Sequence, residues 1–280
     1  MTRLDPAYAS TPLAPRTWRR YVAIGDSTSE GLVDPDGNGS WIGWADRFAA
    51  RLAMAQTEPL EYANLAVAGY RAEQVRATQL DRALAMHPDL MTVVAGVNDV
   101  IAPRPDFDTV ATALAEMFAG ARGIGATVLT FTTPDTSAWS PASRVVRDRV
   151  LTLNRITREL AAEHGVLLLD FAHIPMAADP RIWADRLHIN AVGHLRTGAA
   201  LAWLVGVPGV GPEWADPLGD GAGDAHEPTD NPARGPGSHL SWAIRHLAPW
   251  VVTRVRGHHG HHPPEGKRPT PVAVEVTPAS

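Results

Sequence analysis

The chain has no cysteine among its 280 residues. This absence excludes disulfide bonds, a thiolate nucleophile and cysteine-ligated zinc. Positive charge is not in excess either, because the formal net charge is −5 and the isoelectric point is about 6.2. Proteins that bind nucleic acid generally cluster Lys and Arg side chains that neutralise phosphates. We therefore expect no nucleic-acid partner.

Long apolar runs are also missing. No stretch approaches the roughly 20 apolar residues that a membrane-spanning helix needs. Residues 1–20 carry prolines and charges where a signal peptide would have a continuous apolar segment. The sequence therefore predicts a cytoplasmic protein without a transmembrane segment, and its 45% hydrophobic residues are enough for a large core.

Between residues 21 and 205, short apolar runs alternate with longer amphipathic ones. Strands rich in Val, Leu and Ile, separated by helices, are typical of a parallel sheet joined by right-handed crossovers. The pattern predicts a three-layer α/β/α sandwich around a five-stranded parallel sheet. The expected strands are 21–24, 61–64, 90–95, 127–131 and 166–169, and the expected helices are 42–55, 72–86, 108–122, 143–164 and 191–204.

The composition changes outside this domain. Residues 1–20 are interpreted as an N-terminal arm, and the acidic, Gly- and Pro-rich residues 206–237 as a solvated linker. Residues 238–256 predict an amphipathic helix, which would pack on the protein body, on a second copy or on an anionic membrane surface. The Pro-rich stretch 257–280 is expected to be disordered, so its histidine cluster at 258–262 is predicted to bind metal only adventitiously.

Ser27 follows the first expected strand, within the segment Gly25 to Gly31. In open α/β sheets ligands bind beyond the carboxyl ends of the strands, where this hydroxyl would lie. A serine becomes a nucleophile only when a base removes its proton and a third group orients that base. Asp185 and His188 stand three residues apart before the last expected helix and can supply both groups. Taken alone, Ser27 has the features of a helix N-cap, so its role depends on these partners.

Two further residues are expected at the same edge of the sheet. Gly69 follows the second strand and Asn98 follows the third. A backbone N–H and a side-chain amide can both stabilise the negative oxygen of a tetrahedral intermediate in acyl transfer. Asp26 and Asp99 are interpreted as residues that brace their own turns through backbone hydrogen bonds, and not as a catalytic carboxylate pair.

The ordered set Ser27, Gly69, Asn98 and His188 resembles the four marker residues of the SGNH hydrolases, also called the GDSL lipase/esterase family. The resemblance covers about residues 21–204 and looks most like the actinobacterial members. It implies a flavodoxin-like fold that needs no metal or cofactor. It also implies that Ser27 is the nucleophile, His188 the base and Asp185 its orienting partner, with oxyanion donors at the Ser27 and Gly69 backbone and the Asn98 amide. Thr28 departs from the usual Leu, which should affect packing more than chemistry.

The expected function is a serine esterase that hydrolyses carboxylic esters through an acyl-enzyme. The acyl groups would be small or medium ones on sugars, lipids or aryl alcohols. An acyltransferase with the same triad is the alternative, and a non-catalytic binding module is a third. Trp183, two residues before Asp185, is the best candidate for lining a substrate pocket.

Three other histidines are interpreted as structural or surface residues. His194 falls inside the last expected helix, which favours a structural role over that of a base. His164 and His173 are taken to lack an acid at a useful spacing.

Overall fold

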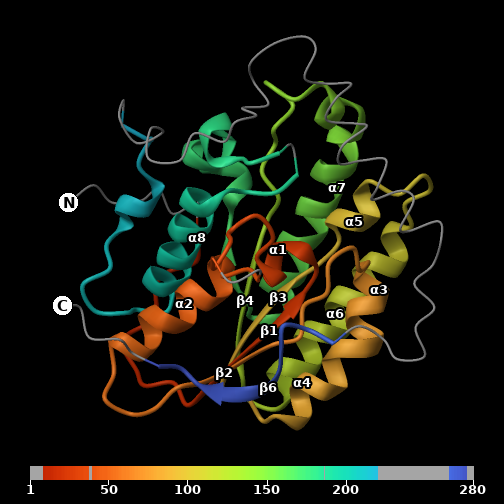
Figure 1. Cartoon of the computed structure of the whole chain (residues 1–280). Helices are drawn as coiled ribbons and strands as arrows, with labels where there is room; N and C mark the ends of the chain where they lie inside the picture. Colours follow the sequence, from red (N-terminus) through yellow and green to blue (C-terminus); the bar gives the residue numbers. More distant parts are fainter. Residues whose placement is uncertain (1–8, 38–39, 186, 220–264, 276–280) are drawn as a thin grey trace.

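The computed structural model describes residues 9–37, 40–185, 187–219 and 265–275. Its centre is a six-stranded sheet with the strand order β5-β4-β3-β1-β2-β6 (Figure 1). The first five strands are mutually parallel, and the sixth runs antiparallel to β2. The strands are β1 (Arg20–Gly25), β2 (Glu61–Asn64), β3 (Leu90–Val94), β4 (Thr127–Phe131), β5 (Leu167–Leu169) and β6 (Arg268–Ala273).

Helices cover both faces of the sheet, which confirms the expected three layers (Figure 1). Successive side chains of a strand point to opposite faces. Along β1, Tyr21 and Ala23 belong to the core shared with α2 (Gly43–Met54) and α8 (Ala191–Leu204). Val22 and Ile24 point to the opposite face and belong to a second core. That second core is covered by α3 (Ala72–Val75), α4 (Asp81–Ala85), α6 (Phe107–Gly123) and α7 (Pro141–His164).

The helix ends follow the local sequence. Helix α7 begins with the Ser140 side chain as N-cap and Pro141 in the first turn, and it ends at Gly165 with a φ of 62°. Both signals are common at helix ends, because proline has no N–H to lose there and glycine tolerates positive φ. The expected helix 72–86 is interrupted by a π-helical turn, η2 (Arg76–Leu80), between α3 and α4. The remaining short elements are α1 (Ser27–Glu30), α5 (Val97–Val100), η3 (Phe171–His173), η4 (Pro175–Ala178), η5 (Pro180–Ile182) and η6 (Pro212–Ala215).

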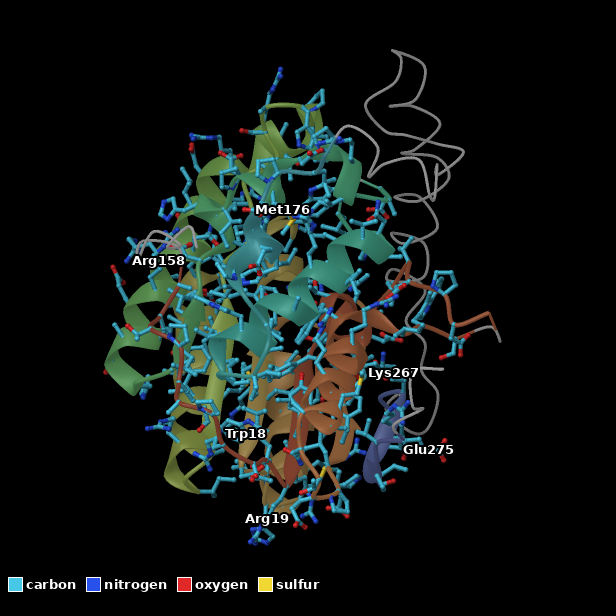
Figure 2. The ribbon with its side chains drawn as sticks, turned by 90° about the vertical axis from the view of Figure 1, so that its left-hand side faces the viewer. Trp18, Arg19, Arg158, Met176, Lys267 and Glu275 are labelled. Carbon is cyan, nitrogen blue, oxygen red and sulfur yellow. The ribbon has the colours of Figure 1, made fainter. Side chains whose placement is uncertain are left out.

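Strand β6 corrects the expectation that residues 257–280 are disordered. Figure 2 shows Lys267, the residue just before this strand, close to α2. Its ammonium group pairs with Asp46 of α2 and donates to the carbonyl oxygen of Trp41 at 3.1 Å. A proline-rich segment tolerates this position because an edge strand uses the hydrogen-bonding groups of only one side. The prolines are therefore compatible with an edge strand, and they leave no N–H groups at their positions for pairing with a further strand.

Residues 206–219 differ from the solvated linker that the composition predicts. Trp214 is 4% exposed, and its ring lies 5.7 Å from that of Trp203 in α8. The expectation failed because a single aromatic residue can anchor a Gly- and Pro-rich segment to the core. The predicted helix 238–256 and the histidine cluster 258–262 lie outside the described residues. Among the helices of the described ranges, none is long and apolar enough to cross a membrane.

Candidate active site

Ser27 lies at the carboxyl end of β1, where the chain turns into α1. Strand β1 pairs with β2 on one side and β3 on the other, so it stands where the strand order reverses, the usual place for a ligand. Asp26 caps α1, since its carboxylate accepts the N–H of Thr28 at 3.0 Å. A Cβ at position 25 would collide with the carbonyl oxygen of Val94, so only glycine fits before this turn.

The structure brings Ser27, His188 and Asp185 into one hydrogen-bonded chain. Oγ of Ser27 lies 3.1 Å from Nε2 of His188, and Nδ1 of the same ring lies 2.9 Å from Oδ2 of Asp185. The imidazole and the carboxylate stand on a loop that leads into α8. A bridge between Trp183 and Ile189 closes the base of this loop.

Asp185 is held by the backbone as well as by the imidazole. Its Oδ1 accepts the N–H groups of Leu187 at 2.7 Å and His188 at 2.6 Å. Burial alone would raise the pKa of Asp185, but the hydrogen bond and charge of His188 together with these backbone N–H groups outweigh it. The pKa therefore lies below its ordinary value, and the carboxylate stays ionised beside the imidazole.

The predicted oxyanion donors lie at the same edge. Gly69 occupies the turn after β2 with a φ of 81°, and in the described part of the chain its backbone N–H has no acceptor. The Asn98 side chain is 4% exposed and donates to the carbonyl oxygen of Tyr70 at 2.9 Å and to Oδ2 of Asp26 at 3.2 Å. Asp26 thus links the turn of the serine to the asparagine.

Asp26 is fully buried, and burial raises its pKa to about 6. The hydrogen bonds from Thr28 and the nearby His188 oppose this shift without cancelling it. Asp26 braces its own turn as expected. The carboxylate of Asp99 accepts the backbone N–H of Ala72 at 2.9 Å and so ties α5 to the start of α3.

Gln79 is a positioning residue that the sequence analysis does not identify. It lies in the π-helical turn, buried, and its amide binds both the N–H of Gly25 at 2.8 Å and the carbonyl oxygen of Gly25 at 2.9 Å. Gly25 is two residues before Ser27, so this double hydrogen bond fixes the end of β1. The available signal is a lone amide on the apolar face of a predicted helix, and π-helical turns are frequent at functional sites.

A cavity of about 440 Å³ opens beside Ser27 and His188. The structure places Trp183 in its wall, where the indole is 7% exposed and donates to the carbonyl oxygen of Ala177 at 3.1 Å. Met176, labelled in the upper half of the molecule in Figure 2, also lines the cavity. Trp18, two residues before β1, is labelled in the lower half of the same view.

His194 is a structural residue, as expected. Its Nδ1 accepts the N–H of Trp44 at 3.1 Å and its Nε2 donates to the carbonyl oxygen of Leu32 at 3.0 Å. Burial lowers the pKa of His194 to about 4, so the ring is neutral at physiological pH.

The interpretation of His173 as lacking an acid is wrong. Nδ1 of His173 lies 3.0 Å from Oδ2 of Asp170, at the same sequence spacing as the pair beside Ser27. Within the described residues, no group of three or more His, Asp or Glu side chains is placed to hold a metal ion.

Comparison with known proteins is consistent with this geometry. A family model described as the GDSL-like lipase/acylhydrolase family matches residues 23–196. No curated protein matches the chain.

Solved structures share the fold. An acetylxylan esterase from Geobacillus stearothermophilus, in a catalytic mutant, has a TM-score of 0.57 and 16% identity over 71% of this chain and 100% of its own. A lipase/acylhydrolase from Enterococcus faecalis has a TM-score of 0.54 and 24% identity over 65% and 93%. An α/β hydrolase enzyme from the metagenome of Lake Arreo, Spain, has a TM-score of 0.55 and 21% identity over 69% and 97%.

Proposed function

Because the chain belongs to the GDSL-like lipase/acylhydrolase family and is therefore an ester-bond hydrolase, we propose that it cleaves carboxylic esters through an acyl-enzyme on Ser27. The observation that carries this proposal is the hydrogen-bonded chain from Ser27 through His188 to Asp185. Each contact lies within the range expected of a nucleophile, its base and the group that orients the base.

In the first half of the reaction, Oγ of Ser27 attacks the acyl carbon while its proton passes to Nε2 of His188. Asp185 holds the opposite ring nitrogen, so it selects the tautomer that can accept this proton and stabilises the imidazolium that forms. The tetrahedral intermediate then expels the alcohol, which takes the proton from His188 and leaves the acyl group on Ser27.

The negative oxygen of that intermediate needs donors that are already in place. The backbone N–H groups of Ser27 and Gly69 supply two. The Asn98 amide supplies the third by turning its longer hydrogen bond, the one to Asp26, toward the oxyanion. Asp26 then acts as a positioning residue, which holds the amide in place before substrate arrives.

In the second half, water attacks the acyl-enzyme and gives its proton to His188. Collapse of the second intermediate releases the acid and returns the proton to Ser27. An alcohol acceptor would follow the same path and yield a new ester. Product analysis with added alcohols therefore separates the hydrolase from the acyltransferase alternative.

Covalent labelling tests the nucleophile directly. We expect a fluorophosphonate probe to label the wild type, and Ser27→Ala to abolish both labelling and the hydrolysis of p-nitrophenyl acetate. Ser29→Ala is the matched control, because Ser29 lies in the same short helix and its buried Oγ has no hydrogen-bond partner among the described residues. Labelling that persists in Ser27→Ala, or that disappears only in Ser29→Ala, would refute the assignment.

A further inference from the structure

The geometry points to a substrate with a straight, medium-length acyl chain of about eight to twelve carbons, which fills the cavity beside Ser27. This inference rests on the proposed function, since it places the acyl group of the acyl-enzyme. Ser27 and His188 line the cavity, so an acyl carbon bonded to Oγ lies inside it. The question is then what chemistry the cavity accepts beyond that carbon.

The walls are apolar on both sides. Helix α7 contributes Val146, Val150 and Leu153, and the segment before the His188 loop contributes Met176, Ile182 and Trp183. Aliphatic and aromatic side chains of this kind remove an acyl chain from water without offering hydrogen bonds.

Several threonines line the same cavity, and four of them use their hydroxyl groups within the protein. Each of the following hydroxyls donates to an oxygen of the protein, so it is not available to a ligand as a free donor. The donors and acceptors are Thr130 to the Val93 carbonyl oxygen at 2.8 Å, Thr132 to Asp170 at 2.6 Å, Thr157 to the Leu153 carbonyl oxygen at 3.0 Å and Thr197 to the Gly193 carbonyl oxygen at 2.9 Å.

His194 also lines the cavity, and both of its ring nitrogens are engaged by backbone groups. A sugar ring in this cavity would therefore lose its hydrogen bonds to water and find few in return. The alcohol part of the ester must lie on the other side of the scissile bond, outside the cavity.

The volume sets the length. A methylene group takes roughly the space of a water molecule, about 30 Å³, so a chain of about ten carbons needs about 300 Å³. The cavity holds about 440 Å³ and leaves modest slack around such a chain. An acetyl group would leave most of this apolar space empty.

Trp183 in the cavity wall packs against Trp139 of the loop after β4. The ring centroid of Trp139 lies 6.1 Å from that of Trp183, and the Trp139 indole donates to the carbonyl oxygen of Ala178 at 2.9 Å. These contacts join the loop after β4 to the segment of η4. The cavity is therefore formed before substrate binds, and little conformational entropy is lost on binding.

A chain-length series tests the inference. p-Nitrophenyl esters from acetate to palmitate, below their critical micelle concentrations, keep the leaving group constant. Burial of one methylene favours the bound state by up to about fourfold. We expect kcat/KM to rise by about 30-fold or more between acetate and decanoate, then to level or fall as the cavity is filled. A profile that is flat within about threefold, or that peaks at acetate, overturns the inference.

Val150→Trp narrows the cavity from α7 without touching the catalytic residues. The larger ring occupies the space of about three methylene groups, so the preferred chain should shorten by about three carbons. Leu151→Trp is the matched control, because Leu151 is the next residue of the same helix, is exposed and is not among the residues lining the cavity. An unchanged profile in Val150→Trp contradicts the assignment.

A second measurement needs no variant. Decanoic acid should inhibit acetate-ester hydrolysis by the wild type competitively, with an inhibition constant at least about tenfold below that of butyric acid. Equal inhibition by the two acids counts against the inference. Loss of all ester hydrolysis in the wild type would instead overturn the proposed function, so the two failures are distinguishable.

Discussion

Asp185 and His188 have the same sequence spacing as Asp170 and His173, and both pairs form a carboxylate–imidazole hydrogen bond, of 2.9 Å and 3.0 Å. Only the first imidazole reaches a serine, with Nε2 at 3.1 Å from Oγ of Ser27. The local motif is therefore identical at two places, and its chemistry depends on what the far side of the ring faces.

The surroundings of the two carboxylates differ as well. Asp170 accepts two hydrogen bonds from the guanidinium group of Arg158, at 2.7 Å and 2.8 Å, and one from Thr132, while the His173 side chain is 54% exposed. A carboxylate neutralised by arginine is a structural anchor. Asp185 accepts hydrogen bonds from backbone N–H groups and from one imidazole. Its negative charge can therefore stabilise His188 when that ring becomes protonated.

The largest expected difference in activity is between variants of His188 and His173. His188→Ala removes the base, and we expect kcat/KM for an ester to fall by about 10⁴-fold or more. His173→Ala should leave it within about twofold, because this ring touches no reacting group. Steady-state kinetics with p-nitrophenyl octanoate checks both. Comparable losses in the two variants would mean that the two pairs are not functionally distinct.

The two carboxylates should differ nearly as much. Asp185→Asn keeps the shape but favours the wrong tautomer of His188, so kcat should fall by about 10³- to 10⁴-fold with little change in KM. Asp170→Asn should change kcat by less than about threefold. A KM effect that dominates in Asp185→Asn would argue against an orienting role.

Asp26 extends the comparison to a fully buried carboxylate whose pKa is raised by burial. Its pKa of about 6 in the folded protein lies above the ordinary 3.8, so the folded state binds this proton more tightly than the unfolded state. Stability is therefore lost as the pH rises from about 4 to 6. Relative to the wild type, Asp26→Asn should gain about 2 kcal/mol more stability at pH 7.5 than at pH 4. Urea unfolding at the two pH values measures this difference, and a gain equal at both contradicts it.

The contribution of Asp170 to stability should depend on pH in the opposite direction from that of Asp26. Its change between acidic and neutral pH should also be smaller. Burial would raise its pKa, but the hydrogen bonds and charge of Arg158 and the bond from Thr132 hold the pKa below its ordinary value. Its contribution is therefore present above about pH 4 and disappears as the pH falls through the folded pKa. Asp170→Asn should cost about 2 kcal/mol at pH 7 and less at pH 3. Equal costs at both pH values would show that the charge is not what matters.

The sequence predicts the body of the fold well because its signals are local. The strands Glu61–Asn64 and Thr127–Phe131 agree with the expected bounds. The polar residues that follow β1, β2 and β3 were expected at one edge, since parallel strands end together. The hydrogen bonds around Ser27 agree with that expectation.

What the sequence could not predict depends on distant partners. Gln79 gains its role only because a π-helical turn aims its amide at Gly25, more than fifty residues earlier. Asp170 and His173 have the same spacing as Asp185 and His188, but spacing alone does not predict that the two side chains meet. The cavity could not be predicted, because apolar residues that line a cavity cannot be distinguished in the sequence from apolar residues that pack in the core.

The position of β6 in the chain affects the order in which the sheet can assemble during synthesis. Ala273 of β6, which pairs with Glu61 of β2, is synthesised more than 200 residues after its partner. The parallel sheet can therefore assemble while its β2 edge is still open, and an open edge is a template for pairing with other chains. Closing that edge late, with a strand whose prolines cannot extend the ladder further, protects each finished molecule from its neighbours.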